Sequence, residues 1–491
     1  MREQPRADRD GVVSTLVPAR MDRLPWSRFH WLVIVGLGVS WILDGLEIQI
    51  VSSVSPVLQH AATLGLTATQ AGLVGTVYLL GEVVGALVFG RITDWLGRRR
   101  LFMWTLALYL VASGIAGLSP TLWFLLAFRF LAGAGIGGEY SAINSAIDEL
   151  IPSRHRGTVD IAVNGTYWAG AMIGSALSIP LLDTHLFPVD VGWRLGFFIG
   201  PVIGVVIIAL RRHIPESPRW LITHGRTNEA ERVVDDVEAQ VRADGARLEP
   251  VPKSRAMRVV AHGTATYAEI ARTMLRRYPT RSLLGFSMMV TQSFLYNAIF
   301  FSYALVLAHF YKVPANHIGY YFFPFAVGNL AGPLLLGRLF DTVGRRRMIS
   351  LTYCLSGAML AGSAWMFHQG LLTAATQTAL WCAIFFVASA GASSAYLTVS
   401  EIFPLELRGQ AISFFFAISQ LVGGVAAPTI FATLVGSGKS PGPLTDGYLV
   451  GAAVMFVGGV IAWFFAVDAE RRPLEDVATP LSAVDRLQST G

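Results

Sequence analysis

Long apolar runs separated by short polar connections make up most of this chain. An α-helix needs about 17–25 residues to cross roughly 30 Å of hydrocarbon, so each apolar run of that length is a candidate membrane span. The chain has twelve such runs, at residues 30–53, 70–91, 101–118, 121–146, 158–182, 195–210, 281–310, 316–338, 348–367, 372–399, 410–435 and 446–467. The hydrophobic pattern therefore predicts an all-α membrane protein with twelve transmembrane helices.

One long polar segment, residues 211–280, separates the first six predicted spans from the last six. It is rich in charge and has a helical pattern over residues 228–241, so it is either a solvated linker or a set of short helices that brace the bundle. We expect an N-terminal tail (1–29), a six-helix bundle (30–210), a linker with short helices (211–280), a second six-helix bundle (281–467) and a C-terminal tail (468–491).

The two halves share sequence motifs. Residues 81–100 read GEVVGALVFGRITDWLGRRR and residues 328–347 read GNLAGPLLLGRLFDTVGRRR, with ten of the twenty positions identical and no gap. A second pattern, Glu-x-x-Pro-x-x-x-Arg-Gly, begins at Glu149 and again at Glu401. Repeats of this kind are typical of membrane carriers built from two parallel six-helix halves. We therefore expect two pseudo-symmetric bundles.

Composition and charge support a place in the bilayer. With 53% hydrophobic and 14% charged residues, the chain is too apolar for a soluble domain of 491 residues. The formal net charge of +6 does not indicate a nucleic-acid partner, because the basic residues lie between spans instead of forming one patch. The connections between spans on one side of the membrane contain only three basic residues, Arg194, Lys312 and Lys439. Because cytosolic loops accumulate Lys and Arg, the other side is expected to face the cytosol. We therefore expect a multi-pass protein of the cell membrane with both termini in the cytosol.

Several other classes of protein are disfavoured. Cys354 and Cys382 lie in apolar stretches without metal-ligand spacing. The first 28 residues carry six Arg and no apolar core, so we expect a cytosolic tail and not a signal peptide. A G-x-x-x-x-G-K-[ST] loop is absent from the sequence, which argues against an ATP-driven pump. We expect no enzyme activity, no cofactor and no metal.

Four further motifs make a family resemblance recognisable. The run Gly90-x-x-x-Asp94-x-x-Gly97-Arg98-Arg99 and its repeat at residues 337–346 resemble the loop signature of the major facilitator superfamily. Four other motifs are similar to those of the sugar-porter and metabolite:proton symporter branch. They are Arg129 followed by three alternate glycines, and the runs at residues 215–220, 292–301 and 400–404. The resemblance implies two bundles that rock about a central site and open it alternately to each side.

The resemblance also implies a cytosolic ion-pair network between the two halves. Charged pairs that exist only when the halves are closed on that side bias the conformational equilibrium. The alternative is that the arginines only orient the chain in the membrane. The candidate latch residues are Asp94, Arg98, Glu149, Arg156, Asp341, Arg345, Glu401 and Arg408.

Ionisable residues deep in the predicted spans are candidates for proton coupling. Asp44 and Glu47 are spaced i, i+3 and share one helical face, and Arg129 lies at a comparable depth. Because two acids face one arginine, one carboxylate is left without a full partner. Such a carboxylate can take up and release a proton, as proton coupling requires. By resemblance, Glu47 matches the acid that pairs with the span-four Arg of proton-coupled sugar porters, whereas Asp-Gly-Leu-Glu resembles the span-one motif of aromatic-acid:proton symporters. A static buried salt bridge is the alternative.

Glu82 is a third buried acid, near the middle of span two. Its counterpart in the repeat is Asn329, so a titratable group in one half stands where the other half has a neutral amide. Glu82 either takes part in proton coupling or hydrogen-bonds a neighbouring helix.

Amide and aromatic residues in the spans suggest a site for a small polar solute. Amides supply hydrogen-bond donors and acceptors, and aromatic faces cover the C–H surfaces of a polyhydroxylated ligand. The candidate substrate-binding residues are Asn164, Trp168, Gln292, Tyr296, Asn297, Asn329, Tyr396 and Gln420. Thr291, Ser393 and Ala395 depart from the hexose-carrier pattern, so a polyol, a cyclitol or an organic acid fits as well as a sugar.

The sequence favours a proton-coupled symporter that imports a small polar organic solute. Its partners are then the solute, protons and the lipid bilayer, with no nucleic acid, and we expect a monomer. A drug or organic-cation exporter would instead use the buried acids to bind positive charge, and an anion carrier would use Arg129 as its ligand. A uniporter is a further alternative.

Overall fold

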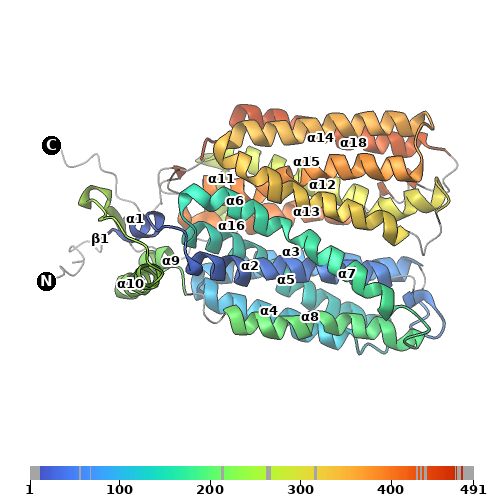
Figure 1. The fold of residues 1–491 in the computed structure, drawn as a ribbon, viewed down its shortest axis with the longest axis horizontal. Coiled ribbons are helices and arrows are strands. Elements are labelled where there is room, and N and C mark those ends of the chain that lie inside the picture. Colours follow the sequence, from blue (N-terminus) through green and yellow to red (C-terminus); the bar gives the residue numbers. More distant parts are fainter. Residues whose placement is uncertain are drawn as a thin grey trace.

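A computed structural model describes residues 12–54, 57–66, 68–211, 215–260, 267–313, 318–426, 430–431, 434–435, 440–469, 472 and 477–478, and these residues are mostly helical (Figure 1). The long helices are α2 (Arg28–Val54), α3 (Ala68–Leu96), α4 (Arg98–Ala116), α5 (Leu122–Leu150), α6 (Ser153–Gly165), α7 (Tyr167–Leu181), α8 (Val189–Arg211), α12 (Pro279–His309), α13 (Ile318–Thr342), α14 (Arg345–His368), α15 (Ala374–Ile402), α16 (Leu405–Ser419) and α18 (Gly442–Phe465).

The prediction of an all-α membrane fold is confirmed, and every predicted span contains helix within the described residues. Seven of these helices are each long and apolar enough to cross a membrane. Predicted span five is two helices, α6 and α7, because the Thr166 hydroxyl donates to the carbonyl of Val163 at 2.6 Å and to that of Gly38 at 3.1 Å. Span eleven continues from α16 into η4 (Gln420–Ala426), a short π-helix.

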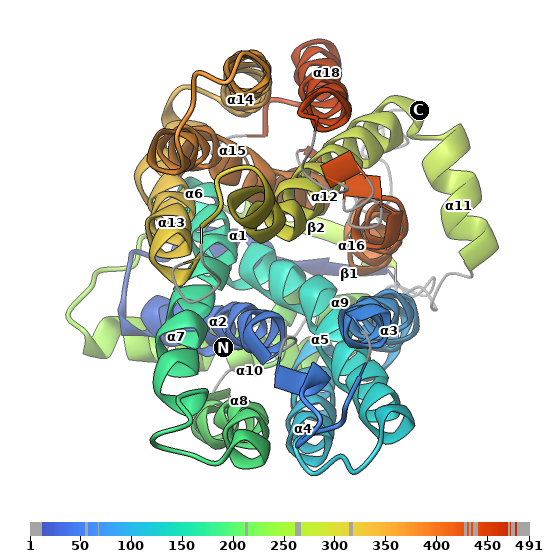
Figure 2. The same cartoon turned by 90° about the vertical axis from the view of Figure 1, so that its right-hand side faces the viewer.

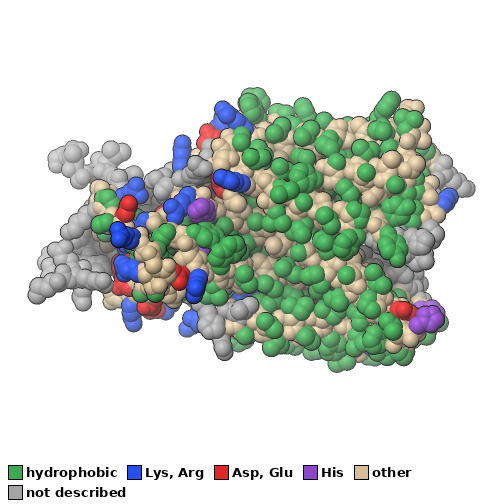
Figure 3. Space-filling model, viewed as in Figure 1, with side chains coloured by type: hydrophobic (Ala, Val, Ile, Leu, Met, Phe, Trp, Pro, Cys, Tyr) green, Lys and Arg blue, Asp and Glu red, His purple; other side chains and the backbone are tan. Residues whose placement is uncertain are grey.

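The helices form two groups. Figure 2 shows α2–α5, α7 and α8 below, and α12, α14–α16 and α18 above. Hydrophobic side chains cover the length of this bundle, whereas Lys and Arg gather at one end, which we call the basic end (Figure 3). An apolar belt bounded by charge is the surface expected of a protein that spans a bilayer.

Glycines bring α3 and α5 into close contact. Gly81 and Gly85 on α3 lie against the backbone of Phe130 and Ala134 on α5, and a Cβ atom at either glycine would overlap a carbonyl oxygen of α5. Gly137 on α5 lies in the same way against the backbone of Glu82. Small residues at such seams let two membrane helices approach closely, so this contact fixes the position of Glu82 in the bundle.

The basic end carries a small assembly of short elements (Figure 1). Strand β1 (Val12–Thr15) pairs antiparallel with β2 (Met257–Val260), and α1 (Val17–Asp22) packs on α9 (Pro218–Thr223) and α10 (Thr227–Ala243). The 211–280 segment therefore contains short helices, α11 (Tyr267–Arg276) among them. Because β1 and α1 precede the first span, the start of the described chain is tied to the segment that joins the two helix groups.

An ion-pair cluster holds this assembly together. Arg20 on α1 lies 2.6 Å from Glu231, 2.6 Å from Asp235 and 2.9 Å from Glu238, all three on α10. Burial by itself raises the pKa of Glu238, but hydrogen bonds from Arg20 and Arg23 outweigh it and lower the pKa to about 2. The stabilisation from this depressed pKa is present above the usual range for Glu and is lost only as the pH falls through about 2.

We predict that Gly137→Ala lowers the thermal stability of the purified protein and that Gly362→Ala does not. The new methyl group at position 137 meets backbone atoms of Glu82, which cannot move aside, whereas nothing lies within 4 Å of a Cβ atom at Gly362. Overpacking of this kind costs about 1–3 kcal/mol. Thermal unfolding in detergent measures the difference, and equal midpoints for the two variants would contradict the tight α3–α5 seam.

Candidate functional site

A cavity of about 350 Å³ lies between the two groups of helices. Its wall is formed by residues of α2, α3 and α5–α7 on one side and of α12, α15, α16 and η4 on the other. The polar and aromatic residues of the wall are Trp41, Asp44, Tyr78, Glu82, Arg129, Tyr140, Asn164, Tyr167, Trp168, Gln292, Ser293, Tyr296, Asn297, Ser389, Ser393, Tyr396, Phe416 and Gln420. A concave site with a few convergent polar groups between aromatic walls suits a small organic ligand.

Most of the predicted substrate residues meet at this cavity. Asn164, Trp168, Gln292, Tyr296, Asn297, Tyr396 and Gln420 are all part of its wall. Asn329 is not: it is fully buried behind Tyr296, whose hydroxyl donates to Asn329 Oδ1 at 3.1 Å. The structure thus places Asn329 where it can orient Tyr296, while the other predicted residues reach the cavity itself.

The predicted residue Tyr396 belongs to an aromatic cluster on the cavity wall whose other members, Trp41, Tyr140 and Phe416, were not predicted. The rings of Trp41 and Tyr140 stack with centroids 4.6 Å apart, and Tyr140 lies 4.6 Å from Phe416. Tyr396 closes the cluster at 5.5 Å from Trp41. The cluster joins α2 and α5 to α15 and α16, so it connects the two helix groups. Aromatic residues inside apolar spans carry no sequence signal that separates a cavity wall from ordinary packing.

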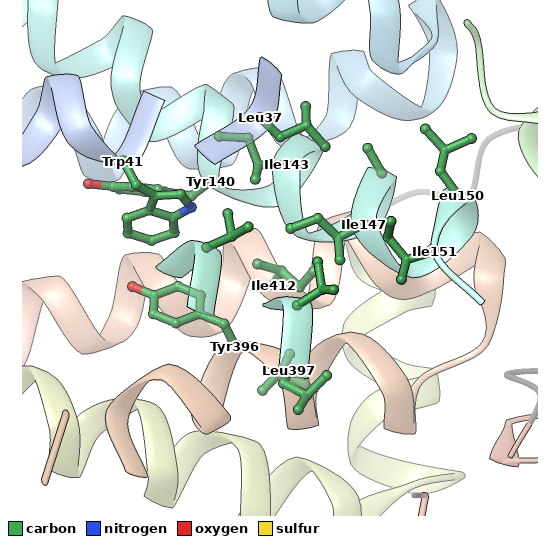
Figure 4. Packing of buried hydrophobic residues seen from close by; sticks show 14 of the residues in the cluster. Leu37, Trp41, Tyr140, Ile143, Ile147, Leu150, Ile151, Tyr396, Leu397 and Ile412 are labelled. Atoms are coloured by element: carbon green, nitrogen blue, oxygen red, sulfur yellow. The ribbon is translucent and has the colours of Figure 1, made fainter. Parts of the chain in front are cut away.

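The apolar packing continues from the cluster along the bundle. Figure 4 shows Leu37, Ile143 and Ile147 packed beyond Trp41 and Tyr140, with Ile412 and Leu397 facing them from the other group of helices. Leu150 and Ile151 extend this core to the end of α5 at the basic end. These side chains fill the space between α5 and α15–α16 on that side of the cavity.

Glu47 and Arg129 form a buried ion pair. Arg129 Nη1 donates to Glu47 Oε1, and both side chains are 1% exposed. Glu47 also accepts the hydroxyls of Tyr109 at 3.1 Å and Ser113 at 3.0 Å. The guanidinium of Arg129 lies 4.1 Å from the centre of the Tyr78 ring. A buried charge pair is tolerated when further hydrogen bonds satisfy both partners, as they do for this carboxylate.

Asp44 has a different environment from Glu47. It lies on the cavity wall and accepts hydrogen bonds from the hydroxyls of Tyr78, at 2.9 Å, and Tyr140. Among the described ion pairs, Arg129 is matched only with Glu47. The i, i+3 spacing thus brings both acids to one region of α2, but neutral tyrosine hydroxyls, not a guanidinium, satisfy Asp44. Neither tyrosine partner of Asp44 was predicted from the sequence.

Glu82 lies on α3, 1% exposed and on the cavity wall. Gln420 Nε2, from η4 in the other group of helices, donates to Glu82 Oε2 at 3.1 Å. The structure thus brings together a residue predicted for proton coupling and one predicted for substrate binding. This hydrogen bond crosses directly between the two groups of helices.

Most of the predicted latch residues meet at the basic end. Arg345 holds Glu401 through two hydrogen bonds of 3.0 Å and Asp341 through one of 2.7 Å. In the first half the repeat counterpart is Arg98, which lies 3.0 Å from Glu149. The side chains of Asp94 and Arg408 lie outside the described residues. Each half therefore pairs the arginine of the first repeated motif with the glutamate of the second.

Contacts between the halves link these pairs. Arg156 Nη1 lies 3.9 Å from Glu401, and the amide and hydroxyl of Thr158 donate to Asp341 at 2.7 and 2.6 Å. The glycine of the Arg-Gly motif, Gly157, has no room for a Cβ atom, because one would overlap Arg345 and Asp341. The repeated glycine thus allows α6 to touch the other half.

Two contributors to this network were not predicted. Asp22 on α1 lies 3.5 Å from Arg156 and 3.4 Å from Arg219. Glu216 accepts the backbone N–H groups at the start of α4, that of Arg98 at 2.9 Å. Burial raises the pKa of the Glu216 carboxyl, although these N–H groups and Arg98 act in the opposite direction. Asp22 is far in sequence from Arg156 and Arg219 and belongs to no repeated motif, so no sequence pattern predicts their contact.

Comparison with known proteins agrees with the fold. Residues 40–480 match the family of sugar (and other) transporters. This chain belongs to that family, within the major facilitator superfamily, and is a multi-pass membrane transporter for small molecules, not an enzyme.

The relatives transport chemically different solutes. The chain is 24% identical to the niacin transporter NiaP of Acinetobacter baylyi, over 84% of this chain and 89% of the relative. It is 26% identical to the inner membrane metabolite transport protein YgcS of Escherichia coli (93% and 96%) and 24% identical to polyol transporter 5 of Arabidopsis thaliana (89% and 83%). In fold it resembles the proton:xylose symporter XylE bound to 6-bromo-6-deoxy-D-glucose, with a TM-score of 0.74, 17% identity and coverage of 92% and 98%.

We predict that Glu401→Gln opens the basic end. The substitution removes the charge that Arg345 and Arg156 share, and a hydrogen bond to a charged group contributes about 1.5–3 kcal/mol, or roughly a 10- to 150-fold change in population. A cysteine placed at Ser393 on the cavity wall, with Cys354 and Cys382 replaced by alanine, should then react at least about ten times faster with a thiol reagent added on the basic side.

The matched control is Glu229→Gln, which removes one partner of the surface pair between Arg226 and Glu229. It should leave the labelling rate unchanged, because this pair lies away from the contacts between the halves. Equal rates for Glu401→Gln and the unsubstituted background would show that the Glu401 cluster does not hold the basic end closed.

Proposed function

We propose that the protein is a proton-coupled symporter that imports a small polar organic solute by alternating access. The observation that carries this proposal is an imbalance of charge around one cavity. Asp44 and Glu82 both lie on its wall, whereas the arginine there, Arg129, is already bound by Glu47. An ionised carboxylate in a low-dielectric site without a cation is costly, and a proton removes that cost.

Alternating access requires contacts that can exist on one side of the cavity at a time. The Arg156–Glu401 ion pair, the Thr158 hydrogen bonds to Asp341 and the aromatic cluster all join the two halves between the cavity and the basic end. Because these contacts would exist when the basic end is closed and be broken when it is open, they would set the equilibrium between the two conformations. The hydrogen bond between Glu82 and Gln420 joins the halves at the cavity itself, where solute and proton would act.

Orientation follows from charge. The basic end is proposed to face the cytosol, since loops on that side accumulate Lys and Arg. Both the β1–α1 segment and the described parts of the 211–280 segment lie at this end, which supports the proposal that the termini face the cytosol. One chain contains a complete cavity, and we propose that it works as a monomer in the cell membrane.

The wall of the cavity limits the class of solute. It combines amides (Asn164, Gln292, Asn297) with aromatic rings (Trp168, Tyr296), a combination that fits a ring with hydroxyl or carboxylate substituents. The niacin and polyol transporters among the relatives are named for solutes of this kind. The two uncompensated carboxylates also favour a second candidate, an organic-cation:proton antiporter.

We predict that purified protein in vesicles takes up protons together with a solute. The panel is D-xylose, xylitol, nicotinate and an organic cation such as tetraphenylphosphonium, each added to vesicles that contain a pH-sensitive dye. Acidification of the lumen by a sugar, polyol or acid, absent from protein-free vesicles and abolished by a protonophore, is the expected result. Alkalinisation of the lumen with the cation would indicate antiport, and solute entry without a pH change would indicate a uniporter; either overturns the symport proposal.

A further inference from the structure

One oxygen of the Glu82 carboxyl is hydrogen-bonded and the other is not. Oε2 accepts the amide of Gln420 at 3.1 Å, whereas Oε1 is buried and has no hydrogen-bond partner among the described residues. The side chain is 1% exposed, and the residue is part of the cavity wall. A buried polar atom without a partner costs free energy unless a ligand, a proton or water satisfies it.

The orientation of the Gln420 amide is fixed from the other side. Ser293 on α12 donates its hydroxyl to Gln420 Oε1 at 2.8 Å, and Asn297 Nδ2 lies 3.3 Å from the same Ser293 hydroxyl oxygen. Because the carbonyl of Gln420 is taken by Ser293, its amide nitrogen faces Glu82. Oε2 of Glu82 is therefore an acceptor, and a proton on this carboxyl has its place on Oε1.

No cation among the described residues is available to hold Glu82 ionised. The charged or titratable groups of the cavity wall around it are Asp44 on α2, Tyr78 on α3, Arg129 and Tyr140 on α5, Tyr167 on α7, Tyr296 on α12 and Tyr396 on α15, with Tyr109 of α4 behind them beside Glu47. Arg129 is bound to Glu47, and Asp44 adds negative charge. The cavity-wall residues from α16 and η4, Phe416 and Gln420, are uncharged.

We propose that Glu82 is a ligand-contacting proton site and that Gln420 is its positioning residue. A proton from water adds to Oε1, and the new O–H group donates a hydrogen bond to an acceptor oxygen of the solute, a hydroxyl or a carboxylate. When that O–H bond breaks, the proton passes to water on the side to which the cavity has opened, and the carboxylate loses its donor to the solute. This assignment rests on the proposed symport and names the atom at which proton and solute meet.

The arrangement also couples the proton to the two halves of the protein. Glu82 belongs to α3, and Gln420 reaches it from η4, where the π-helical turn departs from regular α-helix. Ionisation of Glu82 strengthens the hydrogen bond from Gln420, because hydrogen bonds to charged groups are the stronger ones. Proton binding thus weakens one contact between the halves at the same time as it provides a donor to the solute.

Infrared difference spectroscopy of the purified full-length protein between acid and alkaline pH tests the proton site without any solute. We expect a C=O stretching band of a protonated carboxylic acid at acid pH, lost in Glu82→Gln and kept in Asp44→Asn. The amide in Glu82→Gln retains an acceptor for Gln420 and a donor at the position of Oε1, so the fold should tolerate it. A difference spectrum of Glu82→Gln that keeps every C=O band of the unsubstituted protein overturns the assignment.

Two further variants test the geometry. Gln420→Leu removes the donor to Oε2, so the band should shift in frequency but remain; an unshifted band contradicts the role of Gln420. Glu82→Asp keeps a carboxyl but draws it back from Gln420, and it should likewise shift the band. Because this variant is also acidic, it decides the question if Glu82→Gln does not fold.

Solutes are then added to identify the acceptor oxygen. A shift of the Glu82 band with nicotinate but not xylitol assigns a carboxylate, and the reverse assigns a hydroxyl. A solute that moves protons in vesicles but leaves the band unshifted overturns the contact with Glu82 and leaves symport intact. If no solute moves protons while the band still depends on Glu82, the proposed symport fails and the proton site stands.

Discussion

The imbalance between buried carboxylates and buried cations governs the centre of this transporter. Asp44 and Glu82 lie on the cavity wall, and a third acid, Glu47, is buried and bound by Arg129. The low dielectric of the membrane interior makes every unpaired charge expensive. The protein distributes the remaining acids between two different neutral environments, tyrosine hydroxyls for Asp44 and a glutamine amide for Glu82. Glu47, by contrast, has Arg129 as its ion-pair partner.

The rest of the fold supports this centre. The glycine seam between α3 and α5 holds Glu82 at the cavity wall, and the π-helical η4 presents Gln420 from the other half. Toward the basic end, the aromatic cluster and the contacts of Arg156 and Thr158 with Glu401 and Asp341 hold the halves together. Through Asp22, the α1 segment reaches Arg156 and Arg219. Because Arg156 also contacts Glu401 of the other half, the start of the described chain takes part in the closed contact.

Sequence patterns predicted the architecture well, because the requirement to bury every backbone hydrogen bond in lipid leaves few solutions. The twelve spans, the repeat and the family were evident from hydrophobic runs and motifs. The break at Thr166 was not, since it depends on a side-chain hydroxyl that bonds a carbonyl of its own helix and one of α2. Partners were harder still. Spacing placed Asp44 and Glu47 on one face, but only three-dimensional packing gives Glu47 the arginine and Asp44 the tyrosines.

The central claim is that a proton gradient performs work through this cavity. The most direct test is accumulation of the transported solute in vesicles when an alkaline interior is the sole driving force, with the membrane potential clamped at zero. The account predicts that the internal concentration rises above the external one and falls back when the pH gradient is collapsed. Equilibration to equal concentrations, whatever the pH difference, would contradict it.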